Sequence, residues 1–178
     1  MTVPLIPHAK ITNDSALRET YPRHWLAMRT GLNLLALTGY CIVQELADGL
    51  ANQMNWNSNS FVARYTFRHR LRVGGLVHYE TLPYFRSGLA VVRLTEDGKL
   101  YCHQQKWPVV KSEWEQLIEL HEGDKSPHHT ALVLAFAREA RHRGYKTTVT
   151  PVVEGLSGRL LPDILVDDGR ERVYVEVE

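Results

Sequence analysis

The sequence predicts an α+β protein, with its helices and strands grouped along the chain. Apolar residues recur at helical spacing through most of residues 16–73. The pattern then changes to two short β-rich runs separated by a turn-forming stretch, residues 76–82 and 89–94. After residue 127, one further helical pattern is followed by three β-rich stretches. Such grouping of helices and strands is typical of α+β proteins.

The composition permits a hydrophobic core and excludes several classes of protein. The chain has 178 residues, 44% of them hydrophobic, enough for one large domain or two small ones. Because the net charge is only +1, any nucleic-acid signal must be local. Cys41 and Cys102 form no disulfide framework or zinc pattern, and we interpret them as reduced thiols of a cytoplasmic protein. No apolar run approaches the roughly 18 residues of a membrane span, so no membrane partner is expected.

The first half of the chain predicts a leader followed by three helices. Residues 1–15 are polar and contain proline, and we expect them to form a flexible leader. The helices are expected at residues 16–37, 43–50 and 61–73. Gly39 is placed to end the first helix, Ser58 or Ser60 to cap the third, and Gly74-Gly75 to end it.

Strand signals follow the third helix directly. Residues 76–82 and 89–94 are strand-like, and residues 83–88 between them form the expected turn. Thr95 can then cap a fourth helix over residues 96–105. The first half is therefore predicted to contain three helices, a β-hairpin and another helix.

The second half begins with a short connecting helix and ends in strands. Residues 112–121 read as the helix, and residues 122–127 as the linker. A longer helix is expected at residues 128–143, closed by Gly144. The predicted strands lie at residues 147–153, 160–166 and 172–178. Because the last strand reaches the final residue, we expect a domain that is cut short at its C-terminus.

The third helix carries the strongest binding signal. Arg64, Arg68 and Arg72 recur every four residues, which places them on one helix face, and Arg70 lies beside them. No acidic residue occurs between Ser58 and Gly75. Phosphates suit such a face, because each guanidinium offers a forked donor and a permanent charge. A basic face can also be solvated, or can pair with acidic residues elsewhere.

The order of elements in the first half resembles a winged-helix module. In that class the third helix enters the major groove of double-stranded DNA, and the hairpin reaches the backbone or the minor groove. The resemblance rests on residues 71–77 (LRVGGLV) and 92–99 (VRLTEDGK), where the basic helix ends in Gly-Leu-Val and the second strand runs into Leu-Thr-x-x-Gly. It implies DNA contacts from the arginines of the third helix and from Tyr84, Phe85 and Arg86 at the hairpin turn. The expected division is 1–15 leader, 16–106 winged-helix domain, 107–126 connecting helix and linker, and 127–178 C-terminal domain.

Carboxylates define a second candidate site near the C-terminus. Asp163 follows Pro162 on one predicted strand, while Glu176 and Glu178 alternate on the next. The tight turn at residues 167–169 would place Asp163 and Glu176 side by side on a common face. Converging carboxylates are costly without a cation, and Mg²⁺ prefers such oxygen ligands. Asp163 and Glu176 are thus candidate metal ligands, and all three are candidate catalytic residues. They can equally be the polar face of an amphipathic strand.

This order of elements resembles the restriction-endonuclease-like fold with the PD-(D/E)xK motif. Glu178 stands where that motif usually has Lys, which removes a positive charge that could steady the transition state. Together, the two halves resemble the replication-relaxation family of plasmid and mobile-element proteins, in which a winged helix precedes a nuclease-like region. The residues that carry this resemblance are residues 75–77, 94–98, His128-His129, Pro162-Asp163 and residues 176–178. It implies DNA binding in replication, maintenance or regulation of such an element.

Three interpretations remain open at this stage. The first is a DNA-binding protein whose partial nuclease-like α/β domain serves as a scaffold or oligomerisation unit. The second is a Mg²⁺-dependent DNA endonuclease that uses Asp163, Glu176 and Glu178. The third is a transcriptional regulator with an inactive nuclease-like domain, for which a symmetric homodimer would place two basic helices about one DNA turn apart.

Overall fold

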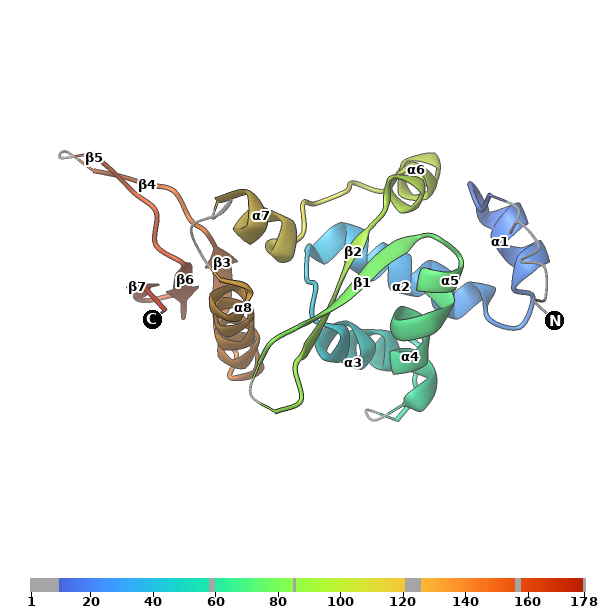
Figure 1. The fold of residues 1–178 in the computed structure, drawn as a ribbon, viewed down its shortest axis with the longest axis horizontal. Coiled ribbons are helices and arrows are strands. Elements are labelled where there is room, and N and C mark those ends of the chain that lie inside the picture. Colours follow the sequence, from blue (N-terminus) through green and yellow to red (C-terminus); the bar gives the residue numbers. More distant parts are fainter. Residues whose placement is uncertain (1–9, 58–59, 85, 121–125, 156–157, 178) are drawn as a thin grey trace.

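A computed structural model describes residues 10–57, 60–84, 86–120, 126–155 and 158–177. The structure is mixed α+β, as the sequence predicts. Helices α1 to α6 and the hairpin β1–β2 form an N-terminal unit, and α7 to β7 form a C-terminal unit beside it (Figure 1). The hairpin crosses the middle of the molecule between these units (Figure 1). No helix in the described ranges has the length and apolar character that crossing a bilayer requires.

The first two helices are separated by a proline. Helix α1 (Asp14–Thr20) begins at Asn13, whose side chain accepts a hydrogen bond from the Ala16 N–H, and α2 (Trp25–Thr38) ends at Gly39 in the left-handed conformation. The single helix expected over residues 16–37 is therefore wrong. Pro22 has no N–H and disfavours helical geometry in Tyr21, which has φ −130° and ψ 59°.

The basic helix follows α3 (Val43–Gln53) and runs without a break from Phe61 to Val73. It comprises α4 (Phe61–Tyr65), the π-helical turn η1 (Thr66–Arg70) and α5 (Leu71–Val73). The Ser60 side chain accepts a hydrogen bond from the Ala63 N–H, which confirms the predicted cap; Ser58 lies outside the described residues. The inner face of the basic helix is buried and is formed by Ala63, Phe67 and Leu71.

The predicted hairpin is confirmed. Strands β1 (Val77–Leu82) and β2 (Leu89–Leu94) pair antiparallel from Val77↔Leu94 to Leu82↔Leu89. Helix α6 (Glu96–Gln104) follows, capped by Thr95, whose hydroxyl accepts from the Gly98 N–H and donates to the Gly75 carbonyl at 2.6 Å. A Cβ atom at Gly98 would lie 2.1 Å from the Leu76 carbonyl oxygen. The Leu-Thr-x-x-Gly pattern thus locks the start of α6 against the segment that precedes β1.

The C-terminal unit has more strands than expected. Helices α7 (Glu113–Leu120) and α8 (Pro127–His142) pack against an antiparallel sheet with strand order β3-β6-β7. These strands are β3 (Lys146–Val149), β6 (Ile164–Asp167) and β7 (Arg172–Val175). The short strands β4 (Val153–Gly155) and β5 (Gly158–Leu160) pair separately. Thr150 has φ +50° and precedes Pro151, so the strand expected over residues 147–153 is interrupted. The expected linker falls mostly on residues 121–125, outside the described residues.

Two hydrophobic clusters share the hairpin. The first core joins α1 to α6 through residues such as Met28, Leu50 and Phe67, and includes the near end of the hairpin, Val77 and Leu94. The second core joins α7, α8 and the sheet, and takes in Leu82, Leu89 and Val91 from the outer end of the hairpin. The two units are therefore connected through the interior of the protein as well as along the chain.

Candidate nucleic-acid interface

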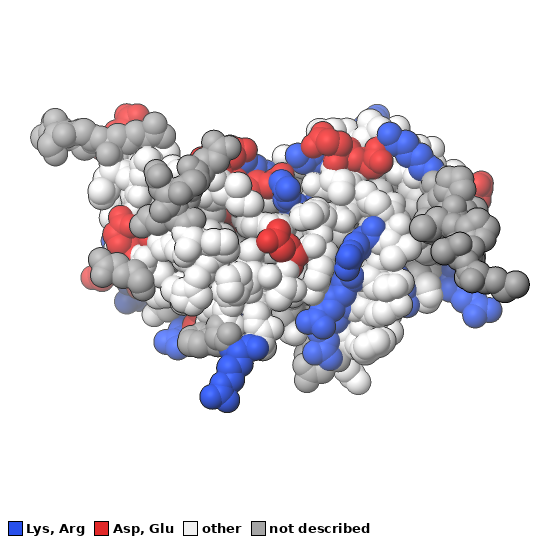
Figure 2. Space-filling model, in the orientation of Figure 1, with Lys and Arg blue, Asp and Glu red and all other residues white. Residues whose placement is uncertain are grey.

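The basic helix presents its arginines toward the hairpin. Arg68 and Arg72 are exposed and Arg64 is half-buried. The Arg72 guanidinium lies 5.8 Å from the ring centroid of Tyr79 on β1, while Arg64 and Arg68 line a hollow at the outer end of the hairpin. Figure 2 shows Lys and Arg side chains in a diagonal row across this face, over the region where Figure 1 places the hairpin and α4. Arg64, Arg68 and Arg72 therefore lie along the side of the basic helix that faces the hairpin, and we call these three residues the basic strip.

Arg70 occupies a different position from the other three arginines. Its Nη1 donates to the Thr66 hydroxyl at 3.3 Å, and its guanidinium lies 5.1 Å from the Tyr65 ring centroid. Partial burial lowers its pKa. Arg70 is held by its own helix, so it is less available to a ligand than Arg68 or Arg72.

An aromatic ladder on the basic helix was missed at the sequence level. Phe61 and Tyr65 stack with ring centroids 5.5 Å apart, and Tyr65 and His69 stack at 4.6 Å. Phe61 is 71% exposed, so its ring lies on the outside of the helix and not in the core. The four-residue spacing that places the arginines on one face also applies to these rings, and was the signal that could have revealed the ladder.

The outer end of the hairpin is only partly available for contacts. Tyr84 is half-buried and packs against the second core. Arg86 is exposed, and Phe85 lies outside the described residues. The C-terminal unit packs against this end of the hairpin, so only part of the Tyr84 side chain is accessible for the expected contact.

A groove opens where the basic helix, the hairpin and α8 meet. It has a volume of about 220 Å³, and its polar lining includes Gln44, Arg64, Arg68, Ser87 and Arg138. Arg138 belongs to the C-terminal unit and comes into this groove only through the tertiary fold. The sequence alone does not single out Arg138, because no local pattern distinguishes it from Arg141 or Arg143.

Asp163 and Glu176 of the second candidate site do not share a face. Asp163 is 2% exposed; its Oδ1 lies 3.2 Å from His129 Nε2, and its Oδ2 accepts from the Val177 N–H at 2.8 Å. Glu176 is exposed, whereas Val175 and Val177 on either side are half-buried against the second core. Pro162 precedes Asp163 outside the regular strand, so strict alternation does not apply there, and the predicted common face for Asp163 and Glu176 is wrong.

The metal prediction gains no support from this geometry. Among the described residues, no group of three His, Cys, Asp or Glu side chains is placed to hold a metal ion. Glu178, the third carboxylate of the predicted set, lies outside the described residues. What the structure brings together instead is a buried pair between α8 and the approach to β6, His129 with Asp163.

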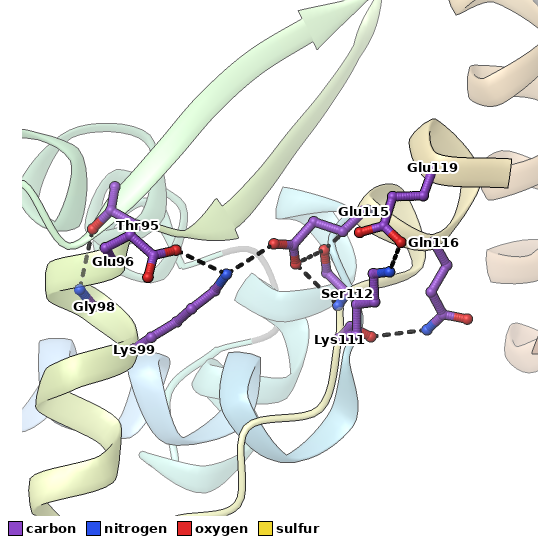
Figure 3. A network of polar contacts seen from close by, with 9 residues as sticks. All are labelled: Thr95, Glu96, Gly98, Lys99, Lys111, Ser112, Glu115, Gln116 and Glu119. Atoms are coloured by element: carbon purple, nitrogen blue, oxygen red, sulfur yellow. Dashed lines mark hydrogen bonds and ion pairs between the residues drawn. The ribbon is translucent and has the colours of Figure 1, made fainter. Parts of the chain in front are cut away.

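A second polar cluster fastens α6 to α7 (Figure 3). Lys99 Nζ lies 3.1 Å from Glu96 and 3.4 Å from Glu115, and Figure 3 shows it reaching between the two helices. Glu115 also accepts hydrogen bonds from the backbone N–H and hydroxyl of Ser112, which forms a capping box for α7. Burial acts to raise the pKa of Glu115, but hydrogen bonds from Ser112 and the charge of Lys99 lower it overall. A hollow beside this cluster is lined by Lys99, Lys111, Glu115 and Glu119. These charges pair with one another, Lys99 with Glu115 and Lys111 with Glu119.

Comparisons with known proteins leave the chain to be interpreted from its own geometry. No family model matches it, and neither the curated proteins nor the solved structures contain a match.

Proposed function

We propose that this protein binds double-stranded DNA through a winged-helix arrangement formed by residues 16–106. In this arrangement α2, α3 and the basic helix form the three-helix unit, and β1–β2 is the wing. The basic helix would enter the major groove, with the hairpin along the adjacent backbone. The observation that carries the proposal is the strip of Arg64, Arg68 and Arg72 beside the hairpin, on a helix with no acidic residue.

Charge and chemistry both favour a polyanion as the ligand of this strip. Arginines paired with phosphates release condensed counterions, so binding should weaken steeply as salt increases. Since the net charge of the whole chain is only +1, the attraction comes from this local surface. We also propose that the C-terminal unit serves as a scaffold, and that the protein acts in replication, maintenance or regulation of a plasmid or mobile element.

A salt titration of DNA binding tests the proposal. Fluorescence anisotropy with a labelled duplex should show that the triple variant R64A/R68A/R72A binds at least about tenfold more weakly and with a smaller salt slope. The matched control is R170A/R172A, two exposed arginines on the β6–β7 connection and β7, which should bind as the unaltered protein does. Equal affinity and equal salt slope in the triple variant and the unaltered protein would refute the proposal.

A further inference from the structure

The groove at the outer end of the hairpin combines arginines from both units. Arg64 and Arg68 enter it from the basic helix, and Arg138 enters it from α8. Among the described residues that line it, none is acidic. Its volume of about 220 Å³ exceeds the share of several water molecules, each about 30 Å³ in the liquid. A phosphate group fits in that space.

The acidic residues that share a neighbouring hollow with Arg138 already accept hydrogen bonds. Glu45 and Asp48 of α3 line a neighbouring hollow together with Arg138. Glu45 accepts two hydrogen bonds from Arg141, at 2.6 and 2.8 Å, and Asp48 accepts one from Gln44 at 2.9 Å. Arg141 compensates the charge of Glu45, whereas Asp48 keeps its charge because the Gln44 amide is neutral. Among the described residues, no acidic side chain lines the groove itself.

A helix N-terminus adds to the same field. Ile42, Val43 and Gln44, where α3 begins, line the groove, and Ile42 offers no side chain to cap the helix. The partial positive charge of a helix N-terminus favours an anion and acts here in the same direction as the three guanidinium groups.

We propose that this groove binds a phosphate of the DNA backbone, and that Arg138 makes the C-terminal unit part of the DNA-binding surface. The inference rests on the proposed function and adds a residue and a second unit to it. Arg72 continues the basic strip beyond the groove, beside Tyr79. The positive surface is thus longer than one phosphate, which favours a polymer backbone over a free phosphate or a mononucleotide.

The test compares Arg138 of α8 with Arg143, the residue that follows this helix, in the full chain. R138A should weaken binding to a labelled duplex by about fivefold to tenfold at low salt, and should reduce the slope of log affinity against log salt by about one, as expected for one phosphate contact. R143A is the matched control, since Arg143 is exposed on the segment that ends α8 and pairs with Glu139 at 2.9 Å. R143A should leave both quantities unchanged, and R138K should retain most of the affinity.

The outcomes separate this inference from the proposed function. If R138A binds as the unaltered protein does while R64A/R68A/R72A loses affinity, the inference fails and DNA binding stands. If the triple variant is also unaffected, the proposed function fails with it. Calorimetry with inorganic phosphate and with a nucleoside monophosphate tests whether the groove binds a free anion instead of the DNA backbone. A small-anion signal that R138A abolishes, with duplex binding unchanged, would assign the groove to a free anion and overturn the inference.

Discussion

Arg141 of α8 and Glu113 of α7 form an ion pair with 2.7 Å between Nη1 and Oε1, and both side chains are 9% exposed. The same guanidinium binds Glu45 of α3 at 2.6 Å and lies 4.2 Å from the ring centroid of Tyr40. One cation thus connects both helices of the C-terminal unit to the N-terminal unit. Two carboxylates share this cation, so the cluster carries one excess negative charge whenever both are ionised.

This excess charge predicts a pH-dependent stability. Burial raises the pKa of Glu113 from 4.5 to about 7, against the opposing effect of Arg141. Between these values the folded protein binds more protons than the unfolded chain, so the free energy of unfolding should fall as pH rises from about 4.5 to about 7. The full change is roughly 3 kcal/mol at about 1.4 kcal/mol per pKa unit. Urea unfolding of E113Q should lack this component and should match or exceed the unaltered protein in stability at pH 8.

Substitution of Arg141, the ion-pair partner of Glu113, should instead lower the stability at pH 8. R141A leaves Glu45 and Glu113 without their common cation and should cost about 3–5 kcal/mol at pH 8. A pH profile of E113Q that parallels the unaltered protein would show that another group titrates in this range.

Substitution of Gly98 should destabilise the start of α6. A Cβ atom there would overlap the Leu76 carbonyl, which is backbone and cannot rotate away, so G98A should cost at least about 2 kcal/mol in thermal or urea unfolding. Gly49 in α3 is the control, because its added Cβ would only contact the Leu34 side chain at 3.6 Å or more. G49A should be neutral or stabilising by about 0.5–1 kcal/mol. A G98A variant as stable as G49A would contradict the close approach.

Substitutions of Asp163 can distinguish a structural role of this side chain from a role in metal binding. D163A removes a buried hydrogen-bond partner of His129 and of the Val177 N–H, and should cost about 2–4 kcal/mol. H128A, at the exposed neighbouring position on α8, should have little effect on stability. Calorimetry with Mn²⁺ on the unaltered chain and on D163N addresses the metal. We expect weak heats that are equal in both, whereas a heat that only D163N loses would make Asp163 a metal ligand.

The aromatic ladder predicts opposite behaviour for two phenylalanines of one helix. Phe61 is 71% exposed, so F61A should change stability by less than about 0.5 kcal/mol. Phe67 is fully buried, and F67A should cost about 3–5 kcal/mol. F61A therefore tests ligand contact in a folded protein: weaker duplex binding at equal stability would extend the interface along the ladder. Unchanged binding would limit the interface to the arginines.

Local signals account for the parts of the fold that the sequence predicts well. The Ser60 cap, the end of α2 at Gly39 and the Thr95-x-x-Gly98 pattern each act within a few residues, and each is present in the structure. The break at Pro22 was also local, but the helical spacing on either side of it hid the interruption. Packing between distant segments cannot be recognised from any short stretch of the sequence. For this reason the approach of Arg138 to Arg68 and the direction of the Asp163 side chain required the tertiary structure.

The hairpin supplies interior side chains to both clusters, so we expect the two units to unfold in one cooperative transition. A fragment that ends near residue 106 would leave Leu82, Leu89 and Val91 in water, and we expect it to aggregate. The same packing connects the basic helix to α8 through the paired strands β1 and β2. A ligand that tilts the hairpin at one end must therefore also displace side chains that pack around Trp114 and Leu134 at the other.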